Sequence, residues 1–398
     1  GTLEIAPKYM LWGLAFIGLL IVSALIHQVQ PGAVFYGVRK YARYIPIFLV
    51  PVLFPEIRER FRDYLWLLLL LTLLQVPMAW YQWATMRIGS SGDAVEGTIT
   101  GSGVLTVYLT AAISLLTAFY VKKKIILPTY AVLAAFLTIP TFLNESTATV
   151  FLLPVAVAAP IFLAGRLDAR KMIAIGLIAW GLLAVFFASY AAQYSDRWGE
   201  GGLGYVVGGG FIDYLYRGAD TDAEDYGEQT EIGRLDSGLL PFKLTDDPVR
   251  WLVGVGMGNA STVHNDVFKG EFSETAERYG VDFTTASALV WETGLIGLIF
   301  SLIFMFVIFQ DSRRVAAGYD DWRGALALGW ASICILIVMS FLYHNLVDHT
   351  TFSYLMWLFC GQIVAMRTQQ NREAYAELAR AASPDGTLTA LNPANNSR

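Results

Sequence analysis

Long apolar runs separated by short polar stretches set the pattern of this chain. As a helix, each run is long enough to cross a hydrocarbon core of about 30 Å, and none shows the residue-by-residue alternation of a barrel strand. Because a backbone inside a bilayer must satisfy its own hydrogen bonds, the runs predict an all-α, polytopic transmembrane bundle of about ten helices. The expected spans are residues 9–27, 34–54, 64–84, 104–121, 125–143, 149–165, 172–192, 286–309, 325–343 and 351–366.

One long polar segment interrupts this pattern, at residues 193–284. The chain as a whole is 55% hydrophobic and 15% charged, yet this segment holds seventeen acidic residues against seven basic ones. We therefore expect four parts: N-terminal transmembrane helices (1–192), one large loop (193–284), C-terminal transmembrane helices (285–367) and a tail (368–398). The tail is expected to begin as a short surface helix and to become disordered.

Basic residues indicate the orientation of the bundle. They gather in alternate short loops, as the positive-inside rule requires of cytoplasmic loops. This pattern predicts that both termini are cytoplasmic and that the large loop faces outward. The basic clusters are Arg58, Arg60 and Arg62; Lys122, Lys123 and Lys124; Arg166, Arg170 and Lys171; Arg313, Arg314 and Arg323; and Arg367 and Arg372.

The second expected span, GAVFYGVRKYARYIPIFLVPVLF, carries Arg39, Lys40 and Arg43 inside its apolar sequence. A cation at the centre of a membrane helix costs about 2.5–3.5 kcal/mol. Two interpretations are open: the cations face a cavity or an anionic head group, or this half of the helix lies in the interface and the side chains extend to water. Arg39 and Arg43 are four residues apart and should share a helix face. Pro46 and Pro51 predict a kink.

The other outward loops contribute a few polar candidates. Arg87 lies in the Gly-rich loop MRIGSSGDAVEGTITGSG. Glu145, in FLNESTAT, is either a general base or an ordinary solvated turn residue. His344, Asp348 and His349 are compatible with a proton relay, but a short polar loop is the simpler interpretation.

The second part of the large loop reads IGRLDSGLLPFKLTDDPVRWLVGVGMGNASTVHNDV. Arg234 opens a stretch that predicts a helix, and by itself it reads as a surface ion-pair residue. The glycines at alternate positions, Gly254, Gly256 and Gly258, permit positive φ or the close approach of a ligand, and with Asn259 they form a candidate substrate loop. No βαβ unit surrounds them, so a dinucleotide fold is excluded. The spacing of the acidic residues is not that of an EF-hand, and no metal site is expected.

The order of these features resembles a known superfamily. An arginine at a helix start, about twenty residues of amphipathic sequence, then LVGVGMGN, then a membrane helix beginning ALVWETGLIGLI is similar to the O-antigen ligase and Wzy-type polysaccharide polymerase superfamily. The earlier VEGTITGSG resembles that superfamily's Gly-containing loop. The likeness covers most of the chain.

This resemblance implies a glycosyltransferase of the GT-C type in the bacterial inner membrane, with the large loop in the periplasm. The donor would be a glycan linked through pyrophosphate to undecaprenol, and the acceptor a second glycan. Arg234 would bind the departing pyrophosphate, because a guanidinium forks onto two phosphate oxygens. Neither metal nor cofactor is implied. Further expected partners are membrane lipids and a flippase or chain-length regulator, and no nucleic acid.

The sequence departs from the superfamily pattern at two places. The ligase-type His-Asn pair before Glu-Thr-Gly is replaced by Phe283 and Thr284, and the nearest such pair is His264-Asn265. His264 or Glu145 is therefore the candidate general base. The arginine expected near residue 145 is also missing, and Arg39, Lys40, Arg43 and Arg87 are the candidate replacements around the pyrophosphate.

The altered His-Asn position favours a polymerase that joins lipid-linked oligosaccharide units for a surface polysaccharide or exopolysaccharide. The first alternative is a ligase that transfers the glycan to lipid A–core. A protein of another class, an anion or lipid-linked substrate transporter, would use the embedded cations as a permeation path. A non-catalytic assembly scaffold would not need cations inside the membrane.

Overall fold

The structure is a computed structural model that describes residues 7–85, 94–144, 146, 148–165 and 233–381, together with residues 173, 176, 177, 180, 181 and 184. All regular elements in these ranges are helices, which confirms the all-α class. The N-terminal elements are α1 (Pro7–Ile26), α2 (Pro31–Ala42), α3 (Ile45–Leu53), α4 (Pro55–Glu59), α5 (Phe61–Leu73), α6 (Gln75–Thr85), α7 (Ser102–Val121), α8 (Leu127–Leu143) and α9 (Ala148–Ala164). The C-terminal elements are α13 (Arg234–Leu244), α14 (Pro248–Val253), α15 (Ser273–Tyr279), α16 (Thr285–Gly318), α17 (Trp322–Ser340) and α18 (Thr350–Ala381).

Five stretches of the described chain are long and apolar enough to cross a membrane, as expected of a membrane protein. They are Lys8–Ile26, Phe61–Thr85, Ser102–Val121, Thr285–Gly318 and Trp322–Ser340. Helices α8 and α9 are apolar but shorter. Most of the expected span 172–192 lies outside the described residues, so the number of about ten spans stays a prediction.

The second expected span is not one helix. It is divided into α2 and α3 at Arg43 and Tyr44. Pro46 has no N–H to donate to the carbonyl of Ala42, so α2 ends where that hydrogen bond would fall. The sequence predicted a kink here, and the structure has one: Arg43 and Tyr44 keep αR dihedrals but belong to neither helix.

Helix α16 is interrupted at Gly294, where φ is 68° and ψ is −172°. The turn after α14 fills this interruption: the backbone N–H of Val255 donates to the carbonyl of Trp291 at 2.7 Å. A Cβ atom on Gly294 would lie 2.2 Å from the carbonyl oxygen of Leu252. The loop and the membrane helix therefore interlock through backbone atoms, which only glycine permits at this position.

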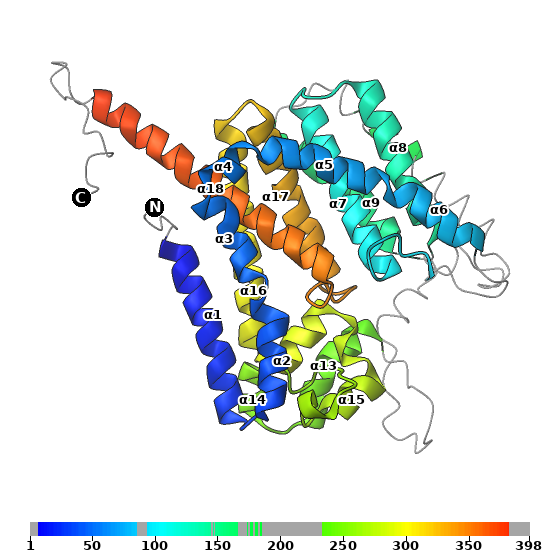
Figure 1. Cartoon of the computed structure of the whole chain (residues 1–398), viewed down its shortest axis with the longest axis vertical. Helices are drawn as coiled ribbons and strands as arrows, with labels where there is room; N and C mark the ends of the chain where they lie inside the picture. The colour runs from blue at the N-terminus through cyan, green and yellow to red at the C-terminus, as the bar shows by residue number, and fades with distance from the viewer. Residues whose placement is uncertain are drawn as a thin grey trace.

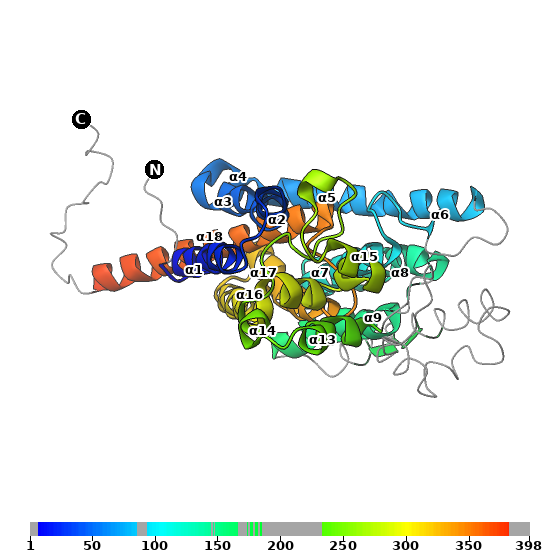
Figure 2. The ribbon, with the colours of Figure 1, turned by 90° about the horizontal axis from the view of Figure 1, so that it is seen from below.

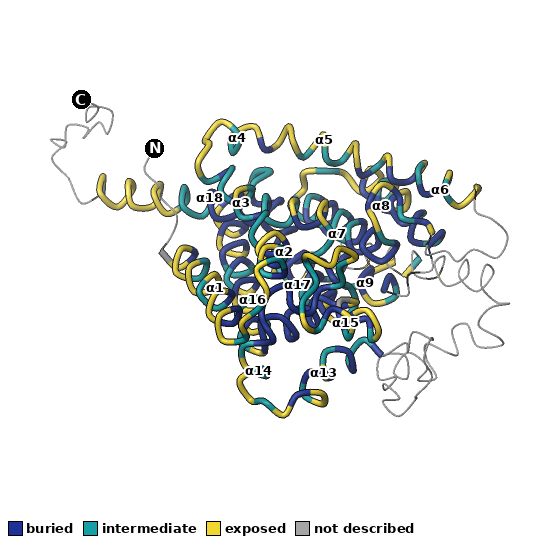
Figure 3. Tube along the Cα trace, turned by 60° about the horizontal axis from the view of Figure 1, so that its bottom comes forward, coloured by how far each residue is buried: buried dark blue, intermediate teal, exposed yellow. Residues whose placement is uncertain are grey.

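The short helices α13, α14 and α15 form a layer at one end of the bundle (Figure 1). Of these, α13 and α14 pack against α16 (Figure 2). The start of α1 and the end of α18 lie at the opposite end (Figure 1). Burial is concentrated in α7, α9, α16 and α17, whereas α5 and α6 are largely exposed (Figure 3).

Helix α18 continues without a break to Ala381. The expected surface helix after the last span is therefore an extension of that span. The disorder expected beyond it falls on residues outside the described part of the chain.

Candidate functional site

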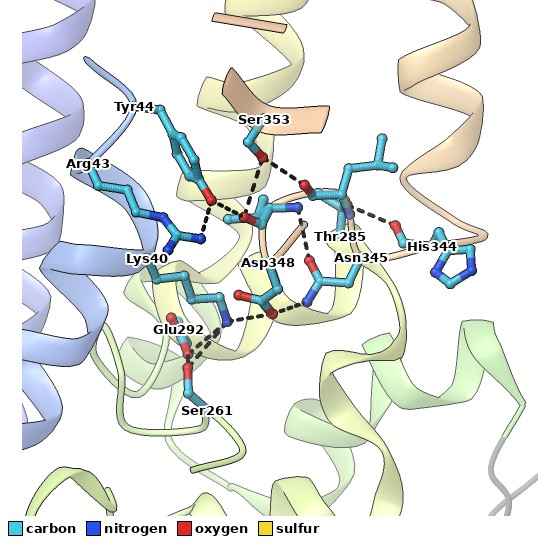
Figure 4. A network of polar contacts seen from close by, with 12 residues as sticks. Lys40, Arg43, Tyr44, Ser261, Thr285, Glu292, His344, Asn345, Asp348 and Ser353 are labelled. Carbon is cyan, nitrogen blue, oxygen red and sulfur yellow. Dashed lines mark hydrogen bonds and ion pairs between the residues drawn. The ribbon is translucent and has the colours of Figure 1, made fainter. Parts of the chain in front are cut away.

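Lys40 is buried at the junction of the bundle and the α13–α15 layer. Its Nζ atom lies 3.4 Å from Glu292 Oε1, 3.2 Å from Ser261 Oγ and 3.6 Å from Asp348 Oδ2 (Figure 4). Ser261 also donates to Glu292 Oε1. Two carboxylates and a hydroxyl thus offset the cost of removing the ammonium group from water.

The position of Lys40 on α2 explains why this cation is buried. Ala33, Gly37 and Lys40 recur at helical spacing and form the inner face of α2. A Cβ atom on Gly37 would lie 2.7 Å from the backbone nitrogen of Gly258. This close approach brings α2 near enough for Lys40 to reach Glu292 on α16.

A small cavity of about 80 Å³ adjoins Lys40. Lys40, Tyr41 and Tyr44 line it together with mainly apolar residues such as Trp12, Phe304 and Trp357. Its other polar lining residues are Thr285, Ser301 and Ser353. The cavity is large enough for a few waters or a small group, but not for a sugar.

The connection between α17 and α18, residues 341–349, forms the centre of the polar cluster. The backbone N–H and the side-chain hydroxyl of Thr285 donate to the carbonyl of His344 at 3.0 and 2.9 Å. Asn345 donates to Asp348, and Ser353 donates to the carbonyl of Leu346 at 2.8 Å (Figure 4). These bonds fix the connection against the start of α16.

Arg43 approaches this connection from the end of α2. Its guanidinium donates to Thr350 Oγ1 at 2.9 Å and to the hydroxyl of Tyr44, and its Cζ lies 4.6 Å from the centre of the Tyr44 ring. No described carboxylate forms an ion pair with Arg43, and its buried Nε has no hydrogen-bond partner within the described chain. A guanidinium with only neutral partners and one unused donor is well suited to bind an anion.

Arg234, at the first position of α13, meets the same connection at Tyr343. It donates to the carbonyl of Tyr343, and its Cζ lies 4.4 Å from the centre of that ring. The imidazole of His344 points away from Lys40 and Glu292 (Figure 4). Arg234 therefore contacts residue 343, whereas Lys40 and Arg43 contact residues 348 and 350.

His344 lies beside Arg234, and His349 contacts His344. The rings of His344 and His349 meet edge to face at 5.9 Å. Burial, the charge of Arg234 and then His349 lower the pKa of His344 to about 3. Burial also lowers the pKa of His349, against an opposing effect of Asp348. His344 is therefore a neutral imidazole at neutral pH, able to accept a proton if a bound anion raises its pKa.

The remaining predicted site residues lie elsewhere. Arg39 is exposed, whereas Arg43, which follows the last residue of α2, is half-buried against Tyr44 and Thr350. His264 is exposed, and no hydrogen bond or ion pair joins its side chain to another described residue. Arg87 and Glu145 lie outside the described part of the chain.

The candidate substrate loop has positive φ at all three glycines, with values of 74°, 100° and 76° at Gly254, Gly256 and Gly258. A Cβ atom at Gly254 would lie 2.4 Å from the backbone of Glu292 and Thr293, and one at Gly258 would lie 1.9 Å from the carbonyl oxygen of Ala33. The close approach expected for these glycines is thus to the chain's own backbone.

Asn259 continues this packing arrangement. It is buried, donates to the carbonyl of Val255 at 2.9 Å and accepts from the backbone of Glu271 at 2.8 Å. Asn259 therefore holds the segment at Val255 to the segment at Glu271. Both belong to the layer that contains α13, α14 and α15, called the polar layer below.

The residues around Lys40 include two that were not singled out from the sequence, Ser261 and Glu292, while Asp348 was considered there only for a proton relay. A carboxylate inside the apolar stretch ALVWETGLIGLI is a signal that could have identified Glu292, because an ionisable residue in a membrane span is a functional candidate by default. Ser261 carries no comparable signal. Within the described ranges, no group of three His, Cys, Asp or Glu side chains is placed to hold a metal ion.

The chain matches no protein-family model and no curated protein sequence. Function is therefore inferred from the residues of this chain.

Proposed function

We propose that the protein is a membrane glycosyltransferase that uses a glycan linked through pyrophosphate to undecaprenol, and that it joins such units into a polysaccharide. One observation supports this most strongly. Three cations from two distant parts of the chain, Lys40, Arg43 and Arg234, reach the connection 341–349 and its end at Thr350, where membrane helices meet a polar layer. A lipid-linked pyrophosphate likewise carries its negative charge where its apolar chain ends, at the boundary between the membrane and the polar layer.

In this proposal the guanidinium groups hold the pyrophosphate as it gains negative charge on leaving the sugar. Fixed donors in a partly dry site stabilise such a leaving group more than water does. Arg43 supplies a guanidinium that no described carboxylate neutralises. The polar layer would face the periplasm and both termini the cytoplasm.

His344 is a candidate for the proton acceptor, in addition to His264 and Glu145. It lies beside Arg234, and its burial keeps it neutral. A bound pyrophosphate would offset the effect of Arg234 and raise the pKa of His344. The acceptor hydroxyl would then lose its proton to this imidazole as it attacks the anomeric carbon.

The test uses purified protein supplied with a pyrophosphate-linked oligosaccharide, without metal, ATP or an ion gradient. We expect the wild type to build longer chains. Arg234→Lys should fold and insert but lose most of this activity, because an ammonium group cannot fork onto two oxygens. Arg278→Lys, at an exposed position on α15, is the matched control.

Two other outcomes identify the alternatives. Single transfer to a lipid A–core acceptor, without a ladder of longer chains, would indicate a ligase. An inactive wild type that moves an anion across sealed vesicles in an Arg43-dependent manner would identify a transporter and refute the proposal.

A further inference from the structure

A second and larger cavity, of about 540 Å³, lies between α5 and the helices α7, α8, α17 and α18. This volume is within the range of about 300–1,000 Å³ common to ligand pockets. The cavity exists because α5 stands away from the bundle: of its residues only Phe61 and Thr72 are buried. Its walls are mainly aliphatic and aromatic side chains.

The charged residues among its lining side chains are Arg62 and Lys124. Both are exposed, and neither makes an ion pair with another residue of the described chain. Arg62 lies at the start of α5 and Lys124 just after the end of α7, so both lie at the same end of the cavity. Trp322, at the start of α17, adds an amphipathic ring at this end.

The length of the cavity matches one leaflet of a bilayer. Along α7 its lining runs from Tyr108 to Phe119, which at 1.5 Å per residue is about 17 Å. Half of a hydrocarbon core is about 15 Å. At the far end Thr72 and Tyr108 bond to each other at 2.6 Å, and no charged side chain lines the cavity there.

We infer that this cavity binds one anionic glycerophospholipid from the leaflet at the basic end of the bundle. The phosphate and head group lie against Arg62 and Lys124, and an acyl chain occupies the apolar wall between α5 and α7. A polyprenyl carrier that served the site near Lys40 would need its phosphate at the other end, where the cavity offers no cation. The inference is independent of the proposed glycosyltransferase activity.

The test measures lipid binding to the whole purified protein. Delipidated protein in detergent is titrated with phosphatidylglycerol and, separately, with phosphatidylcholine of identical acyl chains, and bound lipid is counted by native mass spectrometry. The variant pair Arg62→Gln and Lys124→Gln removes the two cations that line the cavity. The control pair Arg60→Gln and Lys123→Gln removes two exposed cations from the same turns that do not line it.

We expect the wild type to bind one phosphatidylglycerol about tenfold or more tightly than phosphatidylcholine. The reason is that each basic residue near an anionic head group strengthens lipid binding by roughly fivefold. The Arg62 and Lys124 variant should lose that preference, and the control pair should keep it. Ala112→Phe, which fills the apolar wall and leaves the charges in place, should weaken binding of both lipids.

Three results would overturn the inference. The wild type could bind the two lipids equally, or the control pair could lose the preference as fully as the Arg62 and Lys124 pair. A polyprenyl phosphate could also displace phosphatidylglycerol at lower concentration, which would make an isoprenoid the occupant. Because the four substituted cations are exposed, the comparison does not depend on the Ala112→Phe variant folding.

Discussion

The Nζ atom of Lys40 lies 3.4 Å from Oε1 of Glu292, and these side chains are only 3% and 1% exposed. The pair joins a broken N-terminal helix to the interruption in α16, two segments that are more than 250 residues apart in the sequence. It is therefore both a link between the two halves of the bundle and the electrostatic centre of the cluster.

Removing one of the two charges of the Lys40–Glu292 pair should lower the stability of the fold. Lys40→Met leaves the carboxylate of Glu292 buried without its cation, a change that typically costs about 3–5 kcal/mol. The double variant Lys40→Met with Glu292→Gln removes both charges and should recover a large part of that loss. Thermal unfolding in detergent measures the difference.

Lys269→Met is the control, because that lysine pairs with Asp266 at an exposed site and its loss should change little. The losses of stability in Lys40→Met and in Glu292→Gln are added and compared with the loss in the double variant. Equal values would mean that Lys40 and Glu292 do not interact energetically.

Arg39 on α2 and Arg43 just after its end provide a matched pair. Arg43→Gln should lower transfer activity about tenfold to a hundredfold, because a charge-assisted hydrogen bond is worth about 1.5–3 kcal/mol. Arg39→Gln makes the same chemical change at an exposed position and should leave transfer near the wild-type rate. The measurement is the rate of chain lengthening on a pyrophosphate-linked oligosaccharide. Equal losses from the two variants would contradict a specific role for Arg43.

Orientation is tested by chemical labelling. His264 lies in the polar layer and Lys123 at the basic end, and both are exposed. Because basic loops stay in the cytoplasm, an impermeant maleimide on intact cells should label His264→Cys and not Lys123→Cys. The two native cysteines, Cys334 and Cys360, are buried and give a low background. Labelling of Lys123→Cys alone would reverse the proposed topology.

Much of the helical architecture could be predicted because each membrane helix is encoded locally. A run of apolar residues forms a helix in a bilayer whatever its neighbours are, so the expected ranges for α7, α8, α9, α16 and α17 agree with the structure within a few residues at most ends. The interruption after α2 was also predictable, because Pro46 has no N–H to donate to the carbonyl of Ala42.

The site was harder to predict because it is assembled from long-range contacts. Helical spacing predicted that Arg39 and Arg43 share a face, but it does not say where α2 ends or which neighbour of Arg39 faces inward. Lys40 is buried because Gly37 and Gly258 allow two backbones to meet, and that contact spans more than 200 residues. Ser261 became recognisable only through its bond to Glu292.

His344 should make the stability of the protein depend on pH. Its pKa falls from the ordinary 6.5 to about 3 in the folded state, mainly because it is buried. At a pH above 6.5 the imidazole is neutral in both the folded and the unfolded chain. Below it, the unfolded chain binds a proton that the folded chain does not, so stability falls as the pH is lowered towards 3.

For one such group the expected loss between about pH 7 and pH 5 is about 2 kcal/mol. His344→Gln should flatten this dependence in detergent unfolding experiments, although His349, whose pKa is also lowered, would retain a part of it. An identical slope in His344→Gln and the wild type would show that His344 is not held neutral by the fold, and would remove it as the candidate proton acceptor beside Arg234.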